Sequence, residues 1–526
     1  MLQTSILFQD HMVLQRDKKV KIWGTANAGE QITVTMQGMT ATALADGDGK
    51  WEAVCGPFIA SFMEEMTIAS KGETLIRKDI QVGEVWLAGG QSNMEFHMRY
   101  DADMESEKEV CTNSNIRFFD YPEVSYVGQI EEADYGRFYG FWRKAEPDQL
   151  ERFSAVGYYF ARDLQKKYGV PVGIIGCNWG GTPACAWMPW EAVAEGGGQA
   201  YLDEYNEAVE SLNLAEYDEK FRKNPGSWRV DQLSDSINDL MMYGCPMSQI
   251  EEKLMERGLD LSQIDWSALV PGTGPKYERR PSGLYESMLQ PIAPYAIRGV
   301  IWYQGETDGD CHPEIYKSLF PALIKSWREL WDEELPFLFV QIAALEQWLE
   351  CVGTPYVEIR EAQQYTADTV PGTGMAVITD AGMRSDLHPK KKYPVGHRLA
   401  LLAENKVYGE GVLCEAPTLS GVRAEDGRLI LEFENTGDGL YLAGVLPHGQ
   451  KVDAGKFGGL QVFQDGVELN PEFLEAGACG NQVIVTGNVI RADVSTQVKI
   501  AKTGWYLVNL YNSEHIPARP AEVTRE

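Results

Sequence analysis

The sequence predicts an α/β protein in which a parallel sheet, with helices on both faces, is flanked by β-sandwich regions. Three observations lead to this fold class. Residues 1–82 contain short β-rich runs, residues 83–410 alternate strands with helices, and residues 411–526 are β-rich again. Alternating strands and helices are typical of a parallel sheet, and short strands with regular turns are typical of sandwiches. A length of 526 residues agrees with two to four domains.

The two flanking regions share one kind of pattern. The N-terminal runs KVKIWGTA, QITVTMQG and KWEAV are short, rich in β-forming residues and separated by glycine or Asp-Gly turns. No helical period competes with them. The C-terminal region contains the similar runs GRLILEFENTG, GLQVFQDG and NQVIVTG. We therefore expect an N-terminal β-sandwich domain over residues 1–82 and a C-terminal β-rich domain over residues 411–526.

Residues 83–410 are expected to form the central domain, which carries the site. Its predicted strands are the continuous apolar runs VWLAGG, PVGIIGCNW, IRGVIWYQG and PFLFVQIAAL. Apolar side chains recur at helical spacing over residues 154–169 and 312–336, which predicts a helix in each range. Continuous apolar strands between helices indicate a parallel sheet covered on both faces. An acidic, helix-rich stretch over about 191–280 interrupts this order, and we interpret it as an insertion that caps the site.

The composition excludes several classes of function. Asp and Glu outnumber Lys and Arg by 77 to 47, which gives a formal net charge of -30. Non-specific nucleic-acid binding requires a basic surface, so we expect no nucleic-acid partner. The acidity is expected to form a solvated surface that keeps the protein soluble. The nine cysteines are an odd number without a Cys-x-x-Cys pair, which fits neither a disulfide framework nor a zinc site.

The sequence also predicts no membrane partner. No stretch approaches 18 consecutive apolar residues, and the first residues lack a basic region followed by an apolar one. We therefore expect a cytoplasmic protein, although a secreted form trimmed of its signal peptide would look the same. The oligomeric state is left open.

The first segment that carries chemistry is VWLAGGQSNMEFHM. Its strand ends at two glycines, and Ser92 follows where a helix should begin, with His97 expected on the same helix. A serine at a helix N-terminus lies beside backbone N–H groups that can stabilise an oxyanion. The alternative is that Ser92 or Asn93 only caps the helix. The lipase-type motif Gly-x-Ser-x-Gly is absent, because Met94 stands at its second glycine.

Two further segments place suitable groups at predicted strand ends. In IIGCNWGGTPACAWMP, the consecutive Gly180 and Gly181 allow a backbone N–H to approach a ligand closely. In VIWYQGETD, the side-chain amide of Gln304 can donate to a developing oxyanion. An ordinary turn and a glutamine bonded to neighbouring backbone groups are the respective alternatives.

The fourth segment, MAVITDAGMRSDLHPKKKYPVGHRLA, offers a base with nearby acids. A serine nucleophile needs a base to take its proton, and the base needs a carboxylate to orient it. Of the seven histidines, His388 follows a predicted strand and has Asp380 and Asp386 close by. His397 is expected to face solvent or to pack within the next helix.

Together these four segments resemble the carbohydrate-acetylesterase branch of the SGNH hydrolases, typified by sialate O-acetylesterases. The matching blocks are GQSNM, WGGT, WYQGE and DLHP, the last followed by a GHRLA helix. The resemblance reaches from FQDHMVLQRD near the start to about residue 410. It implies the flavodoxin-like SGNH fold and a carboxylic ester hydrolase that removes acetyl groups from sugar hydroxyls. The implied substrate is a 9-O-acetylated sialic acid first, and acetylated xylo- or manno-oligosaccharides second.

The resemblance also implies roles for single residues. Ser92 would be the nucleophile, His388 the general base and then acid, and Asp386 the orienting carboxylate. The oxyanion donors would be the backbone N–H of Ser92, that of Gly180 or Gly181, and the side chain of Gln304. No metal or organic cofactor is implied.

The sequence differs from the wider superfamily pattern at two of these site residues. Gln304 stands where an asparagine is usual, and the acid precedes the histidine by two residues where three are common. Asp380 therefore remains the alternative to Asp386 as the orienting acid.

The sugar should supply much of the binding energy, because an acetyl group is small. Trp187, Trp190 and Tyr303 are candidate stacking surfaces, with core packing as the alternative. Arg384 or the run Lys390–Lys392 could supply positive charge for an anionic sugar.

The sequence argues against two other classes of function. A non-catalytic carbohydrate-binding protein, suggested by the β-rich flanks, would lack Ser92 or His388, and both are present. A lipase or thioesterase would carry an extended apolar lid, whereas the insertion is charged.

Overall fold

The computed structural model describes residues 1–525 except 133–134, 136–137, 224–231 and 260–271. The chain divides into two compact units. The first comprises Met1–Ile301 and Pro321–Leu335, and the second comprises Trp302–Phe320 and Pro336–Glu526. The boundaries fall inside strand β12 (Gly299–Tyr303) and inside helix α12 (Tyr316–Trp331). The predicted central domain therefore contributes to both units.

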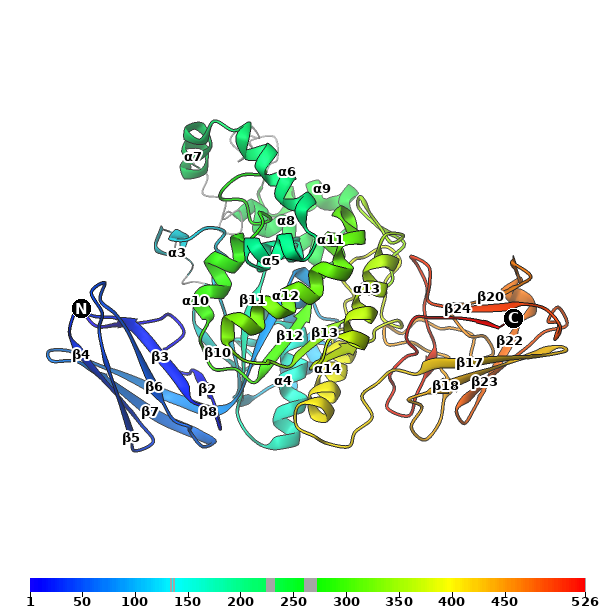
Figure 1. Ribbon diagram of the computed structural model, residues 1–526, viewed down its shortest axis with the longest axis horizontal. Coiled ribbons are helices and arrows are strands. Elements are labelled where there is room, and N and C mark those ends of the chain that lie inside the picture. Colours follow the sequence, from blue (N-terminus) through cyan, green and yellow to red (C-terminus); the bar gives the residue numbers. More distant parts are fainter. Residues whose placement is uncertain (133–134, 136–137, 224–231, 260–271, 526) are drawn as a thin grey trace. The chain divides into compact units, whose positions relative to one another are not determined.

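The first unit begins with two sheets (Figure 1). One has the strand order β1-β3-β6, and the other pairs β5 with β4, β4 with β7, and β7 with β8. Buried and exposed residues alternate along β4 and β6, as expected where one face of a sheet lies in a core. Strand β5 was not among the predicted runs, because its MTATAL sequence has no buried residue. The strands are β1 (Gln3–Thr4), β2 (Val13–Gln15), β3 (Val20–Thr25), β4 (Gln31–Met36), β5 (Met39–Leu44), β6 (Lys50–Cys55) and β7 (Ser61–Ala69).

Strand β8 (Thr74–Gly90) joins this region to the central sheet without a break. Its first residues are exposed or half-buried, and every residue from Ile80 to Gly90 is buried. A strand buried on both faces belongs inside an α/β sheet. The expected boundary between residues 82 and 83 therefore lies within one continuous strand.

The central sheet of the first unit has the order β10-β9-β11-β8-β12. Strand β11 is parallel to both β8 and β9, as predicted, whereas β10 at the edge is antiparallel to β9. Helix α4 (Ala155–Tyr168) begins after Ser154, whose hydroxyl accepts the N–H of Gly157 at 3.0 Å. The remaining strands are β9 (Asn113–Asp120), β10 (Trp142–Ala145) and β11 (Val172–Asn178).

The predicted insertion over 191–280 is helical where the structure describes it, and residues 224–231 and 260–271 of it lie outside the described residues. Its helices are α5 (Trp190–Glu195), α6 (Gln199–Glu210), α7 (Leu214–Lys223), α8 (Gln232–Met242) and α9 (Met247–Glu256). The other helices of the first unit are α1 (Ser92–Glu95), α2 (Met104–Val110), α3 (Gln129–Glu132) and α10 (Gln290–Ile292).

The second unit contains the end of β12, then β13 (Phe337–Val340) and β16 (Thr373–Ala376), which pair in parallel. Its helices are α11 (Glu306–Cys311), α13 (Tyr356–Thr369) and α14 (Tyr393–Lys406). Short antiparallel pairs are formed by β14 (Gln347–Trp348) with β15 (Cys351–Val352) and by β19 (Tyr441–Leu442) with β25 (Leu510–Tyr511).

The C-terminal part of the second unit has two four-stranded antiparallel sheets around one apolar core. The first sheet has the order β17-β18-β23-β22, and the second β21-β20-β24-β26. This agrees with the predicted β-rich region. The strands are β17 (Thr418–Glu425), β18 (Arg428–Glu434), β20 (Leu460–Gln464), β21 (Val467–Glu468), β22 (Glu475–Cys479), β23 (Gln482–Thr486), β24 (Thr496–Ile500) and β26 (Ala521–Arg525).

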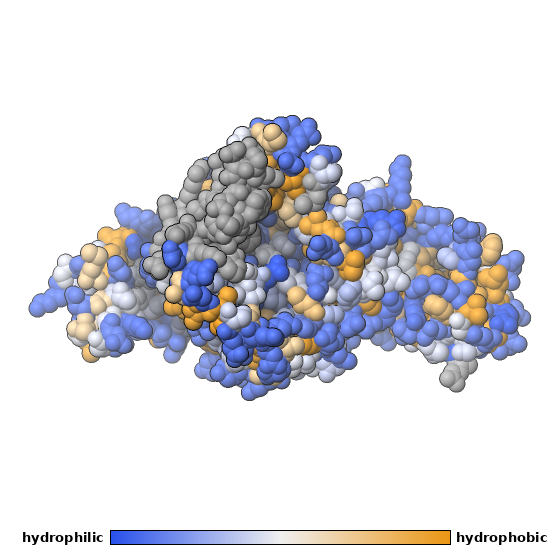
Figure 2. All heavy atoms as spheres, turned by 90° about the horizontal axis from the view of Figure 1, so that it is seen from above, coloured by the Kyte–Doolittle hydropathy of each residue, from blue (hydrophilic) through white to orange (hydrophobic). Residues whose placement is uncertain are grey.

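The surface is mainly hydrophilic on the face that Figure 2 shows, with hydrophobic side chains in separate groups. This agrees with the acidic composition. In the ranges that the structure describes, none of the helices combines the length and apolarity that crossing a bilayer requires.

Candidate active site

The predicted site residues divide between the two units. Ser92 and Gly180 belong to the first unit, whereas Gln304, Asp386 and His388 belong to the second. The predicted nucleophile therefore belongs to the first unit, and the predicted base and its orienting acid belong to the second.

Ser92 follows the central strand β8 in a turn that requires glycine. Gly90, the last residue of β8, has a φ of 134°, where residues with a side chain are rare. Helix α1 begins directly afterwards, with Gln91 as its N-cap and no side-chain capping bond. Ser92 is thus the first helical residue, and Asn93 is buried inside the helix. Neither residue caps α1, so the capping alternative is wrong.

The WGGT block lies beside this turn because β11 and β8 are neighbours. Asn178 at the end of β11 is in register with Gly90, and the N–H of Trp179 donates to the Gly90 carbonyl at 3.1 Å. Thr182 is buried, and its hydroxyl donates to the Trp179 carbonyl at 2.7 Å. The Ser92 segment and the glycine pair are therefore held together within the first unit.

Glu95, at the end of α1, is a residue that sequence reasoning missed. It is buried, and its Oε2 accepts the backbone N–H of Gly180 at 2.9 Å. The Gly180 N–H, one of the two donors considered, is thus engaged by a carboxylate. The alternative, Gly181, follows with a φ of 75°. The available signal was a glutamate three residues after Ser92, on the helix expected to begin there.

His388 and Asp386 lie together in the second unit. The backbone N–H of His388 donates to Asp386 Oδ1 at 2.8 Å, and His388 Nδ1 lies 3.6 Å from the same oxygen. Catalytic hydrogen bonds are often long before substrate binds, so the separation suits an orienting pair. Lys390 Nζ lies 2.9 Å from Asp386 Oδ2. The indole of Trp348 packs edge-on against the imidazole, with ring centroids 5.2 Å apart.

The charge state of this pair follows from burial and neighbouring charges. Burial lowers the pKa of His388 below its ordinary value, against the opposing effect of Asp386 and with support from the charges of Lys390 and Lys392. Burial alone would raise the pKa of Asp386, but the interaction with His388 and the charge of Lys390 hold it below its ordinary value. The pair is therefore a neutral imidazole beside a carboxylate at neutral pH.

Asp380, the alternative acid, has different partners. Its two oxygens each accept a hydrogen bond from Arg398 at 2.7 Å, and Tyr511 donates to Oδ2 at 3.0 Å. Asp380 and Arg398 are both buried. The Asp380 carboxylate therefore anchors α14 and the C-terminal β region, whereas Asp386 is the acid beside His388.

Gln304 directly follows β12 and is completely buried. Its Nε2 donates to Asp308 Oδ2 at 2.5 Å, and its Oε1 accepts from the Tyr316 hydroxyl at 2.9 Å. An amide nitrogen carries two hydrogens, so the bond to Asp308 uses one and orients the other. Gly305 makes this turn possible, because its φ is 148° and an added Cβ would lie 2.8 Å from Ile359.

Two other histidines lie where the structure gives them packing roles. His97 is not on the Ser92 helix, because α1 ends at Glu95; His97 is buried and stacks on Tyr100 at 5.9 Å. His397 is half-buried on α14 and stacks on Tyr393 at 5.4 Å, which agrees with packing in that helix.

Several known proteins are similar to this chain. A family model described as "Carbohydrate esterase, sialic acid-specific acetylesterase" matches residues 263–401. Sialate O-acetylesterase of Rattus norvegicus is 28% identical over 76% of this chain and 72% of its own length, and that of Homo sapiens is 25% identical over 76% and 70%. A carbohydrate acetylesterase from Xanthomonas citri superposes with a TM-score of 0.71 at 26% identity and 99% coverage of both chains. These likenesses support a carbohydrate O-acetylesterase that is similar to the sialate O-acetylesterases.

Two of the three stacking candidates in this esterase belong to its core. Trp187 is fully buried and its indole N–H donates to the Thr182 hydroxyl at 2.9 Å. Tyr303 is also fully buried. Neither ring offers a face to a sugar, so the packing alternative applies to both. Trp190 is half-buried beside Tyr205, with ring centroids 6.0 Å apart, and keeps some exposed surface.

Three of the four cations considered for an anionic sugar are engaged within the esterase itself. Arg384 makes two 2.8 Å hydrogen bonds to the Glu346 carboxylate, and Lys390 pairs with Asp386. Lys392 is completely buried, with Nζ 5.3 Å from the centre of the Tyr303 ring. These side chains position the loop that carries His388.

Proposed function

We propose that this esterase removes acetyl groups from sugar hydroxyls, with Ser92 as nucleophile, His388 as base and Asp386 as orienting acid. The observation that carries the proposal is the buried Asp386–His388 pair, whose imidazole is neutral at neutral pH. A neutral imidazole can accept a serine proton, and a carboxylate beside Nδ1 keeps Nε2 available as the accepting atom.

The proposed reaction has two halves. Ser92 Oγ attacks the acetyl carbonyl while His388 Nε2 takes its proton, and the tetrahedral intermediate collapses as His388 returns that proton to the departing sugar oxygen. A water molecule, deprotonated by His388, then attacks the acetyl-serine. As this second intermediate collapses, His388 returns the proton to Ser92 Oγ and acetate is released. The carboxylate of Asp386 stabilises the imidazolium in both halves.

The developing oxyanion needs donors fixed in advance. The backbone N–H of Ser92 lies at the start of α1, and the amide of Gln304 is held by Asp308 and Tyr316. We assign the third donor to Gly181, because the Gly180 N–H donates to Glu95. In this assignment Glu95 fixes the position of the glycine pair.

For the substrate, a 9-O-acetylated sialic acid is our first proposal. The family description and the names of the mammalian relatives support it. A second candidate is an acetylated neutral oligosaccharide of the xylan or mannan type. Arg384 and Lys390 support that candidate, because the charge of each is already balanced by a carboxylate of this chain.

A substrate panel tests this function. Acetate release should be measured with 9-O-acetylated sialic acid, acetyl-xylo-oligosaccharides and acetyl-manno-oligosaccharides. We expect release from at least one sugar at a kcat/KM well above that for p-nitrophenyl acetate, because the sugar contributes binding energy. A preference for p-nitrophenyl butyrate over all three sugars would contradict a carbohydrate esterase.

The pH dependence of activity offers a further prediction. The acid limb of kcat/KM should have its midpoint below 6.5, the ordinary histidine value, because burial lowers the pKa of His388. In Lys390→Met the midpoint should move to higher pH, since the positive charge that opposes His388 protonation is removed. The measurement is a pH profile of kcat/KM with p-nitrophenyl acetate.

The neighbouring Lys391→Met is the matched control for this profile. Because Lys391 is not among the main charges that act on the pKa of His388, its removal should shift the midpoint less. An acid limb that moves to lower pH in Lys390→Met would contradict His388 as the group that titrates.

A further inference from the structure

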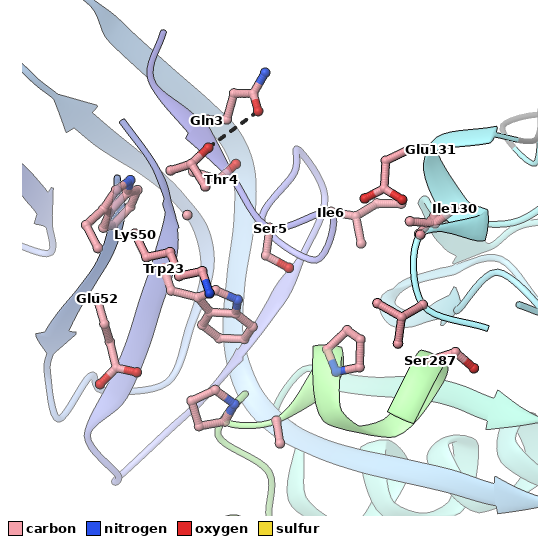
Figure 3. A pocket seen from close by; sticks show the side chains of 18 of the residues that line it. Gln3, Thr4, Ser5, Ile6, Trp23, Lys50, Glu52, Ile130, Glu131 and Ser287 are labelled. Atoms are coloured by element: carbon pink, nitrogen blue, oxygen red, sulfur yellow. Dashed lines mark hydrogen bonds between the residues drawn. The ribbon is translucent and has the colours of Figure 1, made fainter. Parts of the chain in front are cut away.

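The first unit contains a concave site that the esterase reaction does not use. A cleft of about 750 Å³ lies between β3 and β6 on one side and residues 121–131 and 286–294 on the other. Figure 3 shows Trp23 and Lys50 on the strand side, and Ile130, Glu131 and Ser287 across from them. Neither Ser92 nor Gly180 lines the cleft. Its volume is within the range of small-molecule pockets.

Both walls of the cleft are fixed in the folded chain. The indole N–H of Trp142 donates to the Leu7 carbonyl at 3.0 Å, and the Tyr295 hydroxyl donates to the Val13 carbonyl at 2.7 Å. These bonds tie the N-terminal segment to the central part of the same unit. A preformed cleft loses little conformational freedom when a ligand binds.

Trp23 provides a flat, rigid surface in this cleft. Its ring packs edge-on against Phe8, with centroids 4.6 Å apart, and against Tyr295 at 6.4 Å. Phe8 and Tyr295 are themselves stacked at 5.4 Å and buried. Trp23 remains half-buried, so part of the indole is open to the cleft. A pinned aromatic ring with an open surface suits stacking against the apolar face of a ligand.

Carboxylates line the cleft around this ring. Glu52 is the cross-strand partner of Trp23 in the β3–β6 pair, and its side chain is 42% exposed. Asp46, Glu131 and Glu286 line the cleft as well, and among the described residues of the lining Lys50 is the one cation. Glu52 lies 3.3 Å from Lys21, and Glu286 pairs with Arg280 at 2.6 Å, but a carboxylate keeps further acceptor positions. The lining therefore repels anions and accepts hydrogen bonds from hydroxyl groups.

We propose that this cleft binds a neutral oligosaccharide. Trp23 would stack on the apolar face of one sugar ring, and Glu52 would accept hydrogen bonds from its hydroxyls. A neutral sugar is the ligand class that combines an apolar ring face with many hydroxyl donors and carries no charge for the carboxylates to repel. The site is separate from the esterase chemistry and would hold a glycan chain independently of its acetyl groups.

Binding of sugars without acetyl groups tests the proposal. Isothermal titration of the full chain with xylohexaose and with mannohexaose should give saturable binding of at least one. Trp23→Ala should weaken it about tenfold or more, because the stacking surface is lost. Glu52→Gln should weaken it as well, and this exposed, shape-conserving change decides the question if Trp23→Ala does not fold. The anionic probe 3′-sialyllactose should bind more weakly than the neutral sugar.

Phe62→Ala is the matched control, because Phe62 is a half-exposed aromatic residue of the same N-terminal region outside the cleft. Binding and p-nitrophenyl acetate turnover should both be unchanged in it. Turnover should also be unchanged in Trp23→Ala and Glu52→Gln. The proposal is overturned if neither hexasaccharide binds, if Glu52→Gln and any folded Trp23→Ala bind as well as the parent chain, or if sialyllactose binds more tightly. Absent turnover with intact binding would contradict only the proposed esterase activity.

Discussion

Ser92→Ala is expected to lower acetate release from p-nitrophenyl acetate by about 10⁴-fold or more, with folding unchanged. The variant removes the oxygen that would form the acetyl-enzyme. It should not disturb the fold, because Ser92 is the first residue of α1 and does not cap it, and alanine is a good helix former. Steady-state kinetics measure the loss, and thermal unfolding followed by circular dichroism measures the stability.

Ser106→Ala is the control for this variant. Ser106 is an exposed serine on α2, and its substitution should change neither turnover nor unfolding temperature. Retained turnover in Ser92→Ala would show that another group is the nucleophile.

Asp386→Asn is expected to lower kcat, whereas Asp380→Asn is expected to lower stability. Asp386→Asn should lower kcat by about 10⁴-fold, because an amide beside His388 Nδ1 no longer orients the imidazole or stabilises the imidazolium. Asp380→Asn should instead lower the free energy of unfolding by about 3 kcal/mol, because Arg398 keeps a buried charge without its carboxylate. Its kcat, measured on the folded fraction, should stay near that of the parent protein.

Each variant serves as the control of the other, since both exchange one carboxylate for an amide. Kinetics and urea unfolding should be measured on the same samples. A larger loss of kcat in folded Asp380→Asn than in Asp386→Asn would reverse the assignment of the orienting acid.

Local patterns were sufficient to predict the fold class and most elements. The apolar periodicity of residues 154–169 and the continuous apolar run before Ser92 correspond to α4 and the end of β8. These predictions are correct because burial requires apolar residues at fixed spacing. A helix with one buried face repeats them every three or four residues, and a strand with both faces buried is apolar throughout. Strand β5 and the continuity of β8 across residue 82 were missed, because neither leaves a distinct local pattern.

The sequence by itself also determined the candidate chemistry, since the four blocks contain a serine, a histidine with nearby acids, a glycine pair and a side-chain amide at the end of a predicted strand. Only the tertiary structure decided how these groups are used. It paired Asp380 with Arg398 and Asp386 with His388, engaged the Gly180 N–H with Glu95, and buried Trp187 and Tyr303. The physical reason is that hydrogen bonding and burial depend on neighbours far apart in the chain. The cleft around Trp23 has the same origin, because Phe8, Tyr295 and Glu52 meet that ring only after folding.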